Sequence, residues 1–421
     1  MSEEKIGNRN LVVLGAIIVQ LCLGSIYAWG IFQNELYRLD GLYGWDKLWS
    51  NLPFAAGLAS FAIVMIYAGR RQDRVGPRKV ATLGGVLLGI GVILSGLVDI
   101  LGFGADMVQG TLYLIITYGI VGGAGIGFAY VCPIAALVKW FPDKKGFMTG
   151  IAVAGFGGGA LIFNFVEQGL ISYFGYVIGY PLMILGAIYL IFTVLGAQLL
   201  VNPPVGWLPQ GFTPPATTAD GKGTGCVPGV MIRTSSFWVL WLMFIFAATA
   251  GLMTLGNVVS AARGIDLTIT AFIAALIPSI MAIFNAAGRI VWGTVSDRIG
   301  RISTFIMMFS ILALAMFGLA FIPTGTSWIV ITLIASVVGF CFGGNFALFP
   351  SATADYFGSA NVGKNYGVVF TAYGIAGITG ALVAGTFGQA FGYSMAFLVT
   401  GILAVIAVLL TFALKSCRKN A

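Results

Sequence analysis

The chain has 421 residues, of which 59% are apolar and only 9% are charged, whereas roughly 25% of an average soluble domain is charged. With a mean hydropathy of +0.98, the chain lacks the charge to cover a soluble surface, so a soluble enzyme is excluded and an integral membrane protein is predicted. The net charge of +8 lies in short basic runs between apolar segments, which indicates membrane topology and not a nucleic-acid surface.

Twelve apolar stretches follow one another, and each is long enough to cross a bilayer as a helix. They lie at 11–33, 51–69, 80–101, 110–132, 147–166, 176–201, 236–258, 267–292, 302–322, 327–350, 366–388 and 393–414. The longest polar connection is rich in proline and glycine, as is typical of an extended linker. The sequence therefore predicts an all-α membrane protein with an N-terminal six-helix bundle (1–201), a linker (202–235) and a C-terminal six-helix bundle (236–421).

Lysine and arginine are distributed unequally between the two sides of the predicted membrane domain. Three of the 22 basic residues (Arg38, Lys47 and Arg263) lie on one side. Arg289 lies inside a span, and the remaining 18 lie on the side of the two termini. The positive-inside rule therefore predicts that both termini and the linker are cytoplasmic. We expect a multi-pass protein of the cell (inner) membrane.

An eight-residue pattern occurs once in each half of the chain. Residues 69–76 (GRRQDRVG) recur 224 positions later as residues 293–300 (GTVSDRIG), between the second and third helix of each half. Two glycines and an Asp-Arg pair suit a tight loop whose charges hold helix ends together and release them during a conformational change. The residues predicted to form this conformational latch are Gly69, Asp73, Arg74, Gly293, Asp297 and Arg298. A solvated basic loop is the alternative for either copy alone.

The repeated loop and the six-plus-six arrangement resemble the major facilitator superfamily over essentially the whole chain. Shorter motifs are similar to those of its oxalate/formate antiporter and monocarboxylate porter family. These motifs are WFPDKKG (140–146), NPPVGW (202–207), FW (237–238) and FPS (349–351). The resemblance implies a major facilitator fold with twelve transmembrane helices. It also implies a secondary transporter of small carboxylates, with one central site that is reached alternately from each side.

Arg289 is a fixed positive charge within the eighth predicted span. A charge deep in a span costs about 2.5–3.5 kcal/mol on insertion scales, so it needs an interior cavity or a partner. Arginine also matches a carboxylate with two parallel hydrogen bonds. The resemblance assigns the substrate carboxylate to this position, because the arginine of the family's eighth helix falls on Arg289. An arginine that snorkels to the headgroups, or a structural ion pair, is the alternative.

Two further positions bear on the substrate. Where oxalate-type antiporters carry a second cation, a lysine in helix 11, this chain has Tyr373 when aligned through residues 364–367. One fixed cation suits a monocarboxylate better than a dianion. Asn285 lies one turn before Arg289, so both face the same way. Related animal porters have an Asp there that handles protons, whereas a neutral Asn suits orienting the guanidinium or binding a substrate hydroxyl.

Aromatic side chains are expected to form the apolar wall of the substrate site. The resemblance places at pocket positions Tyr27, Tyr130, Phe342, Phe346 and Phe370. Several family members have Trp or Tyr where this chain has Phe, so the cavity is expected to be more apolar. Such a cavity suits a short alkyl or hydroxyalkyl tail, as in lactate or pyruvate. For any one of these residues alone, ordinary helix packing is the alternative.

Any coupled proton needs a carboxyl group, because the chain has no histidine. The acids near predicted membrane ends are Glu167, Asp99, Asp106 and Asp266. Asp266 is preferred, because it begins the helix that carries Arg289 and resembles the acid that bacterial monocarboxylate porters use in coupling. The hypothesis is that Asp266 takes a proton while Arg289 takes the anion. A loop acid paired with Arg263 is the alternative.

Other chemistry has no support in the sequence. The glycine runs at 122–127 and 155–159 follow no strand, so they suit close helix packing and not nucleotide binding. Five scattered cysteines without a CxxC pair predict no metal site, and we expect no cofactor and no enzymatic activity. The favoured hypothesis is proton symport of a lactate-like monocarboxylate by a functional monomer in the lipid bilayer. The alternatives are anion exchange of the oxalate/formate type, a passive pore and, last, a membrane enzyme.

Overall fold

The computed structural model describes residues 9–37, 41–204, 206–209 and 226–418, and within these ranges all regular structure is helical. The prediction of an all-α protein is confirmed for this part of the chain. Helix contacts divide the chain into two compact units. The first unit comprises Met1–Trp140, Gly155–Thr213 and Ala360–Gly367, and the second comprises Phe141–Ala154, Pro214–Ser359 and Val368–Ala421.

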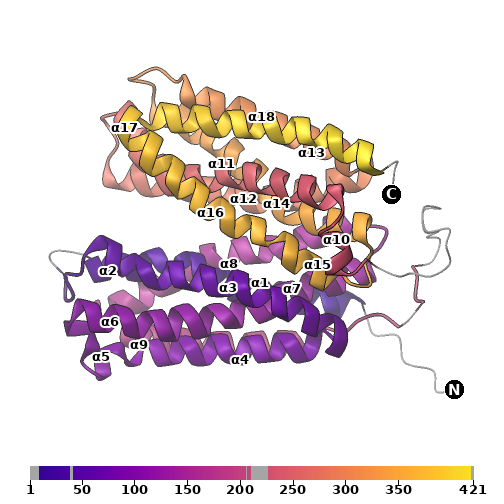
Figure 1. The fold of residues 1–421 in the computed structure, drawn as a ribbon. Helices are drawn as coiled ribbons and strands as arrows, with labels where there is room; N and C mark the ends of the chain where they lie inside the picture. The colour runs from indigo at the N-terminus through magenta and orange to yellow at the C-terminus, as the bar shows by residue number, and fades with distance from the viewer. Residues whose placement is uncertain (1–8, 38–40, 205, 210–225, 419–421) are drawn as a thin grey trace. The chain divides into compact units, whose positions relative to one another are not determined.

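The first unit is a bundle of long helices that run alongside one another (Figure 1). Its elements are α1 (Arg9–Gly24), the 3-10 helix η1 (Ser25–Trp29), α2 (Gly30–Tyr37), α3 (Lys47–Val75), α4 (Pro77–Ser95), α5 (Leu97–Ile100), the 3-10 helix η2 (Phe103–Ala105), α6 (Met107–Leu114), the π-helix η3 (Ile115–Gly122), α7 (Gly123–Trp140), most of α8 (Lys145–Tyr173), α9 (Gly179–Gln198) and most of α15 (Val362–Val369). α4 packs against α7 and α9, and α3 packs against α7 and η3. The first and fourth predicted spans thus contain turns that are not α-helical.

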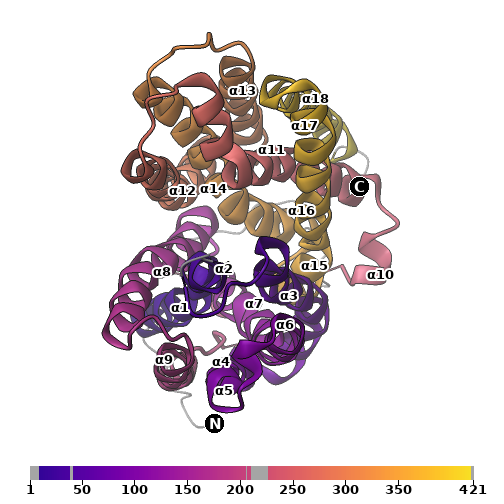
Figure 2. The ribbon, with the colours of Figure 1, turned by 90° about the vertical axis from the view of Figure 1, so that its left-hand side faces the viewer.

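The second unit contains the start of α8, the end of α15 and the other helices of the C-terminal half (Figure 2). Its other elements are α10 (Pro228–Met231), α11 (Ser235–Ile265), α12 (Ala271–Ile299), α13 (Arg301–Ala320), α14 (Trp328–Phe357), α16 (Thr371–Val383), the π-helix η5 (Ala384–Gly388), α17 (Gln389–Phe391) and α18 (Tyr393–Arg418). α12 packs against α14, α13 against α18, and α11 against α16 and α18. Much of the predicted linker, residues 205 and 210–225 with Lys222, lies outside the described residues. The bundle boundaries 1–201 and 236–421 stay a prediction.

Eleven helices in the described part of the chain are long and apolar enough to cross a membrane. Their outward surfaces are apolar, since Phe165, Leu314 and Phe321 are each more than 70% exposed. Side chains of this kind would be costly in water and are suited to lipid. The chain is therefore a multi-pass membrane protein.

The eleventh predicted span, 366–388, is not one continuous helix. A turn at Phe370 separates α15 from α16. The indole N–H of Trp241 donates to the Thr371 hydroxyl at 2.9 Å, and this hydroxyl donates to the Val368 carbonyl at 2.7 Å. These bonds supply partners beside the break, where lipid offers none.

The repeated eight-residue pattern is mostly helical, which corrects its prediction as a loop. Asp73 lies in the last turn of α3 and Asp297 in the last turn of α12, so each connection is a single glycine. Gly76 has φ 88° and ψ 161°, and Gly300 has φ 85° and ψ 161°, a region that only glycine adopts readily. α3 and α12 extend beyond the predicted apolar stretches. The reason is that the exposed arginines near their ends favour a helix and stay solvated.

Candidate functional site

Arg289 lies in α12 of the second unit and is 2% exposed. Its Nε donates to Asn285 Oδ1 at 3.1 Å, and its Nη1 donates to the backbone carbonyl of Val153 on α8. Its Cζ lies 4.6 Å from the ring centre of Phe346, within the range of a cation–π contact. An amide oxygen, a backbone carbonyl and an aromatic ring, all neutral, thus contact the guanidinium. An arginine that snorkels to the headgroups would be far more exposed.

Glycines bring the neighbouring helices close enough for these contacts. A Cβ on Gly150 of α8 would collide with the carbonyl oxygen of Arg289, and a Cβ on Gly343 of α14 would collide with that of Asn285. Backbones therefore touch at both points, as small residues allow in membranes. The Asn285 amide also donates to the Gly339 carbonyl at 3.2 Å, which leaves its oxygen directed at Arg289. The geometry agrees with a role for Asn285 in orienting the guanidinium.

Four of the predicted aromatic residues lie together in the same unit. The ring centres are 5.3 Å apart for Phe342 and Phe346, 5.4 Å for Phe346 and Tyr373, and 5.2 Å for Phe370 and Tyr373. None is more than 5% exposed. We call these four rings, with Arg289 and Asn285, the cation–aromatic site.

Sequence reasoning missed Phe244 of α11, which supports this site. Its ring stacks on Phe349 at 4.2 Å and lies 6.4 Å from Phe346 and 6.2 Å from Phe370. Phe244 is fully buried. An apolar residue in a helix that is apolar on all sides gives no periodic signal, so only the resemblance singled out the other rings.

The remaining two predicted aromatic residues belong to the first unit. Tyr27 of η1 and Tyr130 of α7 both meet the edge or face of Phe156, at 5.3 and 5.2 Å between ring centres. Phe61 joins them at 5.1 Å from Tyr130. Gln20 donates to the Tyr130 carbonyl at 3.2 Å. Tyr27 and Tyr130 thus share one aromatic group, of which the sequence did not single out Phe61 and Phe156.

Asp266 lies between α11 and α12 and is 7% exposed. It accepts the Thr268 hydroxyl at 2.6 Å, the Thr268 N–H at 2.9 Å and the Trp328 N–H at 2.8 Å. These donors, the Thr268 hydroxyl first, stabilise the carboxylate and hold the pKa of Asp266 below its usual range. No ion pair with Arg263 occurs among the described residues. Proton uptake by Asp266 stays a prediction, and it requires that these donors first be withdrawn.

The first copy of the repeated pattern holds the start of a helix. Asp73 Oδ2 accepts the backbone N–H of Lys364 on α15 at 2.9 Å, and Lys139 Nζ lies 3.5 Å from Oδ1. A carboxylate at a helix N-terminus is favoured by the helix dipole. A Cβ on Gly69 would collide with the Gly363 carbonyl, so the two backbones touch there.

The second copy makes the corresponding contacts in the second unit. Asp297 accepts the backbone N–H groups of Gly146 and Phe147 on α8 at 2.9 and 2.7 Å. A Cβ on Gly293 would collide with the Gly146 carbonyl. Four predicted latch residues, Gly69, Asp73, Gly293 and Asp297, therefore form matching helix contacts.

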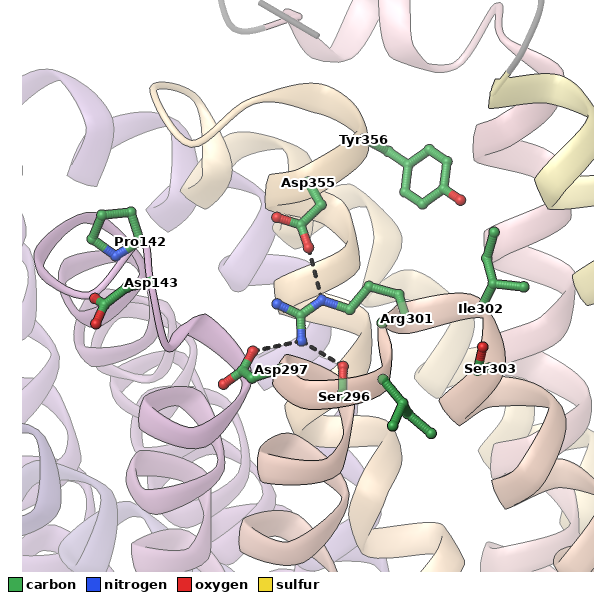
Figure 3. A pocket seen from close by; sticks show the side chains of 11 residues that line it. Pro142, Asp143, Ser296, Asp297, Arg301, Ile302, Ser303, Asp355 and Tyr356 are labelled. Atoms are coloured by element: carbon green, nitrogen blue, oxygen red, sulfur yellow. Dashed lines mark hydrogen bonds and ion pairs between the residues drawn. The ribbon is translucent and has the colours of Figure 1, made fainter. Parts of the chain in front are cut away.

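The cations of the second copy are not those predicted. Arg74 and Arg298 are exposed and form no ion pair in the described ranges. Arg301 instead lies 2.9 Å from Asp297 and 2.7 Å from Asp355, and Lys145 lies 2.7 Å from Asp355. Figure 3 shows the Arg301 guanidinium between the two carboxylates, at a pocket of about 500 Å³. The sequence missed Arg301 as a contact because Pro77 occupies the equivalent position of the first copy.

The chain is similar to known membrane transporters over most of its length. The chain matches the model of the Major Facilitator Superfamily over residues 10–380 and 326–419. It is 31% identical over 376 residues to the uncharacterized MFS-type transporter YhjX of Escherichia coli K12, with 88% of this chain and 86% of the relative covered. It is 31% identical over 424 residues to the oxalate:formate antiporter of Oxalobacter formigenes, with 98% and 93% covered. It is 25% identical over 453 residues to apicoplast pyruvate carrier 1 of Toxoplasma gondii, with 86% and 80% covered.

Solved structures share the fold at low sequence identity. The proton:xylose symporter XylE superposes with a TM-score of 0.72 at 16% identity, over 96% of this chain and 95% of that one. The fucose:proton symporter FucP of Escherichia coli gives 0.70 at 14% identity, over 96% and 98%. The predicted major facilitator fold is confirmed by these likenesses.

Proposed function

The chain belongs to the Major Facilitator Superfamily, and from that premise we propose that it is a secondary active transporter of a small monocarboxylate such as lactate or pyruvate. The cation–aromatic site is the observation that carries this proposal. A buried guanidinium supplies the charge and the planar donor pair that a carboxylate needs. The packed rings around it suit a short apolar tail.

The neutral residue at position 373 favours one carboxylate over two. Tyr373 packs on Phe370 and Phe346 and offers no second cation beside Arg289. A dianion would leave one charge poorly compensated in a low-dielectric site. The names of the oxalate:formate antiporter and the apicoplast pyruvate carrier agree with a small carboxylate as the substrate class.

The proposed mode is proton symport by alternating access, in a monomer with both termini cytoplasmic in the cell membrane. The contacts of Asp73 and Asp297 act as the latch that holds helix ends in one conformation and releases them in another. Transport of one proton with one carboxylate is electrically neutral, which avoids the cost of moving a net charge across the bilayer.

Anion exchange is the second candidate. It is supported by the 31% identity to an oxalate:formate antiporter over 98% of the chain. It is also favoured by the hydrogen bonds that keep Asp266 ionised, since an exchanger needs no proton acceptor.

The test is uptake of labelled L-lactate into proteoliposomes, with and without an inward pH gradient. Wild type is compared with Arg289→Ala and, as a matched control, with Arg263→Ala, because Arg263 is an exposed arginine. Accumulation that needs the gradient and is lost only in Arg289→Ala supports symport at this site. Uptake that ignores the gradient but responds to preloaded anion supports exchange. No lactate uptake in either format would reject the proposed substrate class.

A further inference from the structure

Glu167 is a buried acid in the membrane-spanning part of the first unit. It lies on α8 and is 2% exposed. The hydroxyl of Tyr189 is 3.5 Å from Oε1, longer than the 2.5–3.0 Å of an ordinary O–H···O bond. Oε2 has no hydrogen-bond partner, and the carboxyl has no salt bridge, within the described ranges. An ionised carboxylate would be costly in this place, since it is shielded from bulk solvent and pairs with no cation among the described residues.

Two tyrosines from other elements interact with Glu167, namely Tyr189 of α9 and Tyr118 of η3. Ser25 of η1 and Cys22 of α1 lie next to Tyr189 in turn. The Tyr189 side chain also forms a hydrogen bond with Ser25. We call Glu167 and these four residues the acid site. Its hydroxyl groups can rotate to accept from a protonated carboxyl or to donate to an ionised one.

Two of these elements have irregular backbones. Ser25 begins the 3-10 helix η1 in the first span, and Tyr118 lies in the π-helix η3 of the fourth span. Irregular backbone is tolerated at membrane depth only where it is buried in protein or lines a cavity, and π-helical turns are frequent at functional sites. Tyr118 interacts electrostatically with Glu167, and Ser25 forms a hydrogen bond with Tyr189, whose hydroxyl is the nearest to the carboxyl. Both irregular segments therefore border this place.

Close backbone contacts between α1 and α8 lie beside the aromatic group of the first unit, which includes Tyr27 and Phe156. A Cβ on Gly24 would collide with the Phe156 carbonyl, and a Cβ on Gly159 would collide with the Leu21 carbonyl. The backbones of α1 and α8 therefore touch at two points one turn apart, next to the place where Phe156 meets Tyr27. α1, which leads directly into η1 and Tyr27, is therefore in backbone contact with α8, which carries Glu167.

The other acids near the membrane ends are held differently. Asp99 accepts the Gly179 N–H at 2.7 Å, and Asp106 accepts the Gln109 N–H at 2.8 Å. Asp266 accepts two backbone N–H groups and a hydroxyl, as described above. Such bonds fix loops and helix starts, which is a structural role for these acids. Glu167 accepts no backbone N–H in the described part of the chain.

We infer that Glu167 binds the coupling proton of the transport cycle. The proton adds to a carboxylate oxygen of Glu167 from one side of the membrane and leaves the same oxygen toward the other side. The substrate carboxylate is bound meanwhile at Arg289 in the second unit. This inference rests on the proposed function, because it assigns the proton that symport requires.

The test uses Glu167→Gln, which has the shape of the protonated acid and cannot release a proton. Three quantities are measured in proteoliposomes: exchange of labelled L-lactate against internal lactate at equal pH, accumulation driven by an inward pH gradient, and lactate-induced acidification of a trapped pH dye. We expect Glu167→Gln to keep exchange at the wild-type rate and to lose accumulation and acidification to the level of empty vesicles. Asp106→Asn, a substitution of an exposed capping acid, is the matched control and keeps all three.

Each other outcome separates this inference from the proposed function. Gradient-driven accumulation that persists in Glu167→Gln overturns the inference, and its loss in Asp266→Asn alone assigns the proton to Asp266. Wild-type exchange without any gradient response overturns the inference and leaves a carboxylate exchanger. If Glu167→Gln also loses exchange, Glu167→Asp decides. Accumulation with a shifted pH dependence then supports the inference, and an unshifted pH dependence overturns it.

Discussion

Arg289 in the second unit and Glu167 in the first are equally buried, at 2% exposure each, yet their surroundings differ. Arg289 has an amide oxygen, a backbone carbonyl and an aromatic ring within reach of its guanidinium. Glu167 has one distant hydroxyl and a carboxyl oxygen without a hydrogen-bond partner in the described part of the chain.

This difference indicates which function each of the two buried side chains is suited to. Arginine stays protonated at any physiological pH, so the protein has to stabilise a permanent charge with fixed acceptors. A carboxyl group can give up its charge instead, and poor solvation favours that choice. The first arrangement suits binding an anion, and the second suits binding and releasing a proton.

The largest effect is expected from changing Arg289, because the comparison depends on its permanent charge. Two charge-assisted hydrogen bonds to a carboxylate, at about 1.5 kcal/mol or more each, correspond to at least about 100-fold in affinity. Arg289→Ala should therefore lose lactate transport by about that factor or more. Arg289→Lys keeps a point charge and should recover part of it, about tenfold, since it lacks the planar fork. Concentration-dependent uptake measures both, and equal affinity in Arg289→Lys and wild type would contradict bidentate binding.

Asn285 tests whether the fixed acceptors matter. Asn285→Ala removes the oxygen that orients the guanidinium, and a hydrogen bond to a charged group contributes about 1.5–3 kcal/mol. We expect the apparent affinity for lactate to fall about tenfold, with a smaller change in maximal rate. Asn285→Asp keeps the acceptor but adds a competing negative charge, so it should weaken lactate binding further. An Asn285→Ala protein with unchanged affinity would mean that the Val153 carbonyl and Phe346 suffice.

Gly76 and Gly300 each connect two helices, and they test whether the two copies of the repeated pattern contribute equally to stability. Ala at position 76 or 300 has to adopt a conformation that costs about 1–3 kcal/mol outside glycine. Gly76→Ala and Gly300→Ala should lower the thermal unfolding midpoint in detergent by similar amounts. Gly377→Ala is the control, because this glycine lies within α16 with open space beside it. A drop in only one of the two variants would show that the repeat is not energetically equivalent.

The smallest effect is expected for Asp266, and it is measured as the pH dependence of the unfolding temperature. Its folded-state pKa lies below the ordinary value of 3.8, so it adds stability above that value and loses this stability as the pH falls through the folded-state pKa. Asp266→Asn should unfold at a lower temperature than wild type at pH 7. The difference should shrink below about pH 4. A difference that stays constant with pH would show that the carboxylate charge is not what holds Thr268 and Trp328.

The sequence predicts those features that depend on local pattern. Apolar length located the spans, and the spacing of Asn285 and Arg289 by one helical turn predicted their contact. The paired loops predicted matching roles for Asp73 and Asp297, which both accept backbone N–H groups.

Other features depend on partners far away in the chain. No proline near Phe370 predicts a turn there. The turn is supported by the hydrogen bond from Trp241 to Thr371, which lies 130 residues away in the chain. Glu167 looked like one of several acids near membrane ends, because nothing in its neighbours along the chain shows that its carboxyl is left with so few donors. Phe244 is one ring among 32 phenylalanines, so burial beside Phe346 could not be singled out.

The two latch contacts differ in the order in which their partners are synthesised. Gly146 and Phe147 precede Asp297 by 151 and 150 residues, so both partners are synthesised before Asp297. Asp73 precedes Lys364 by 291 residues. The first unit therefore depends on residues 360–367, which are synthesised after most of the second unit. An N-terminal fragment cut in the linker would lack this segment and would have to obtain it from a co-expressed C-terminal fragment.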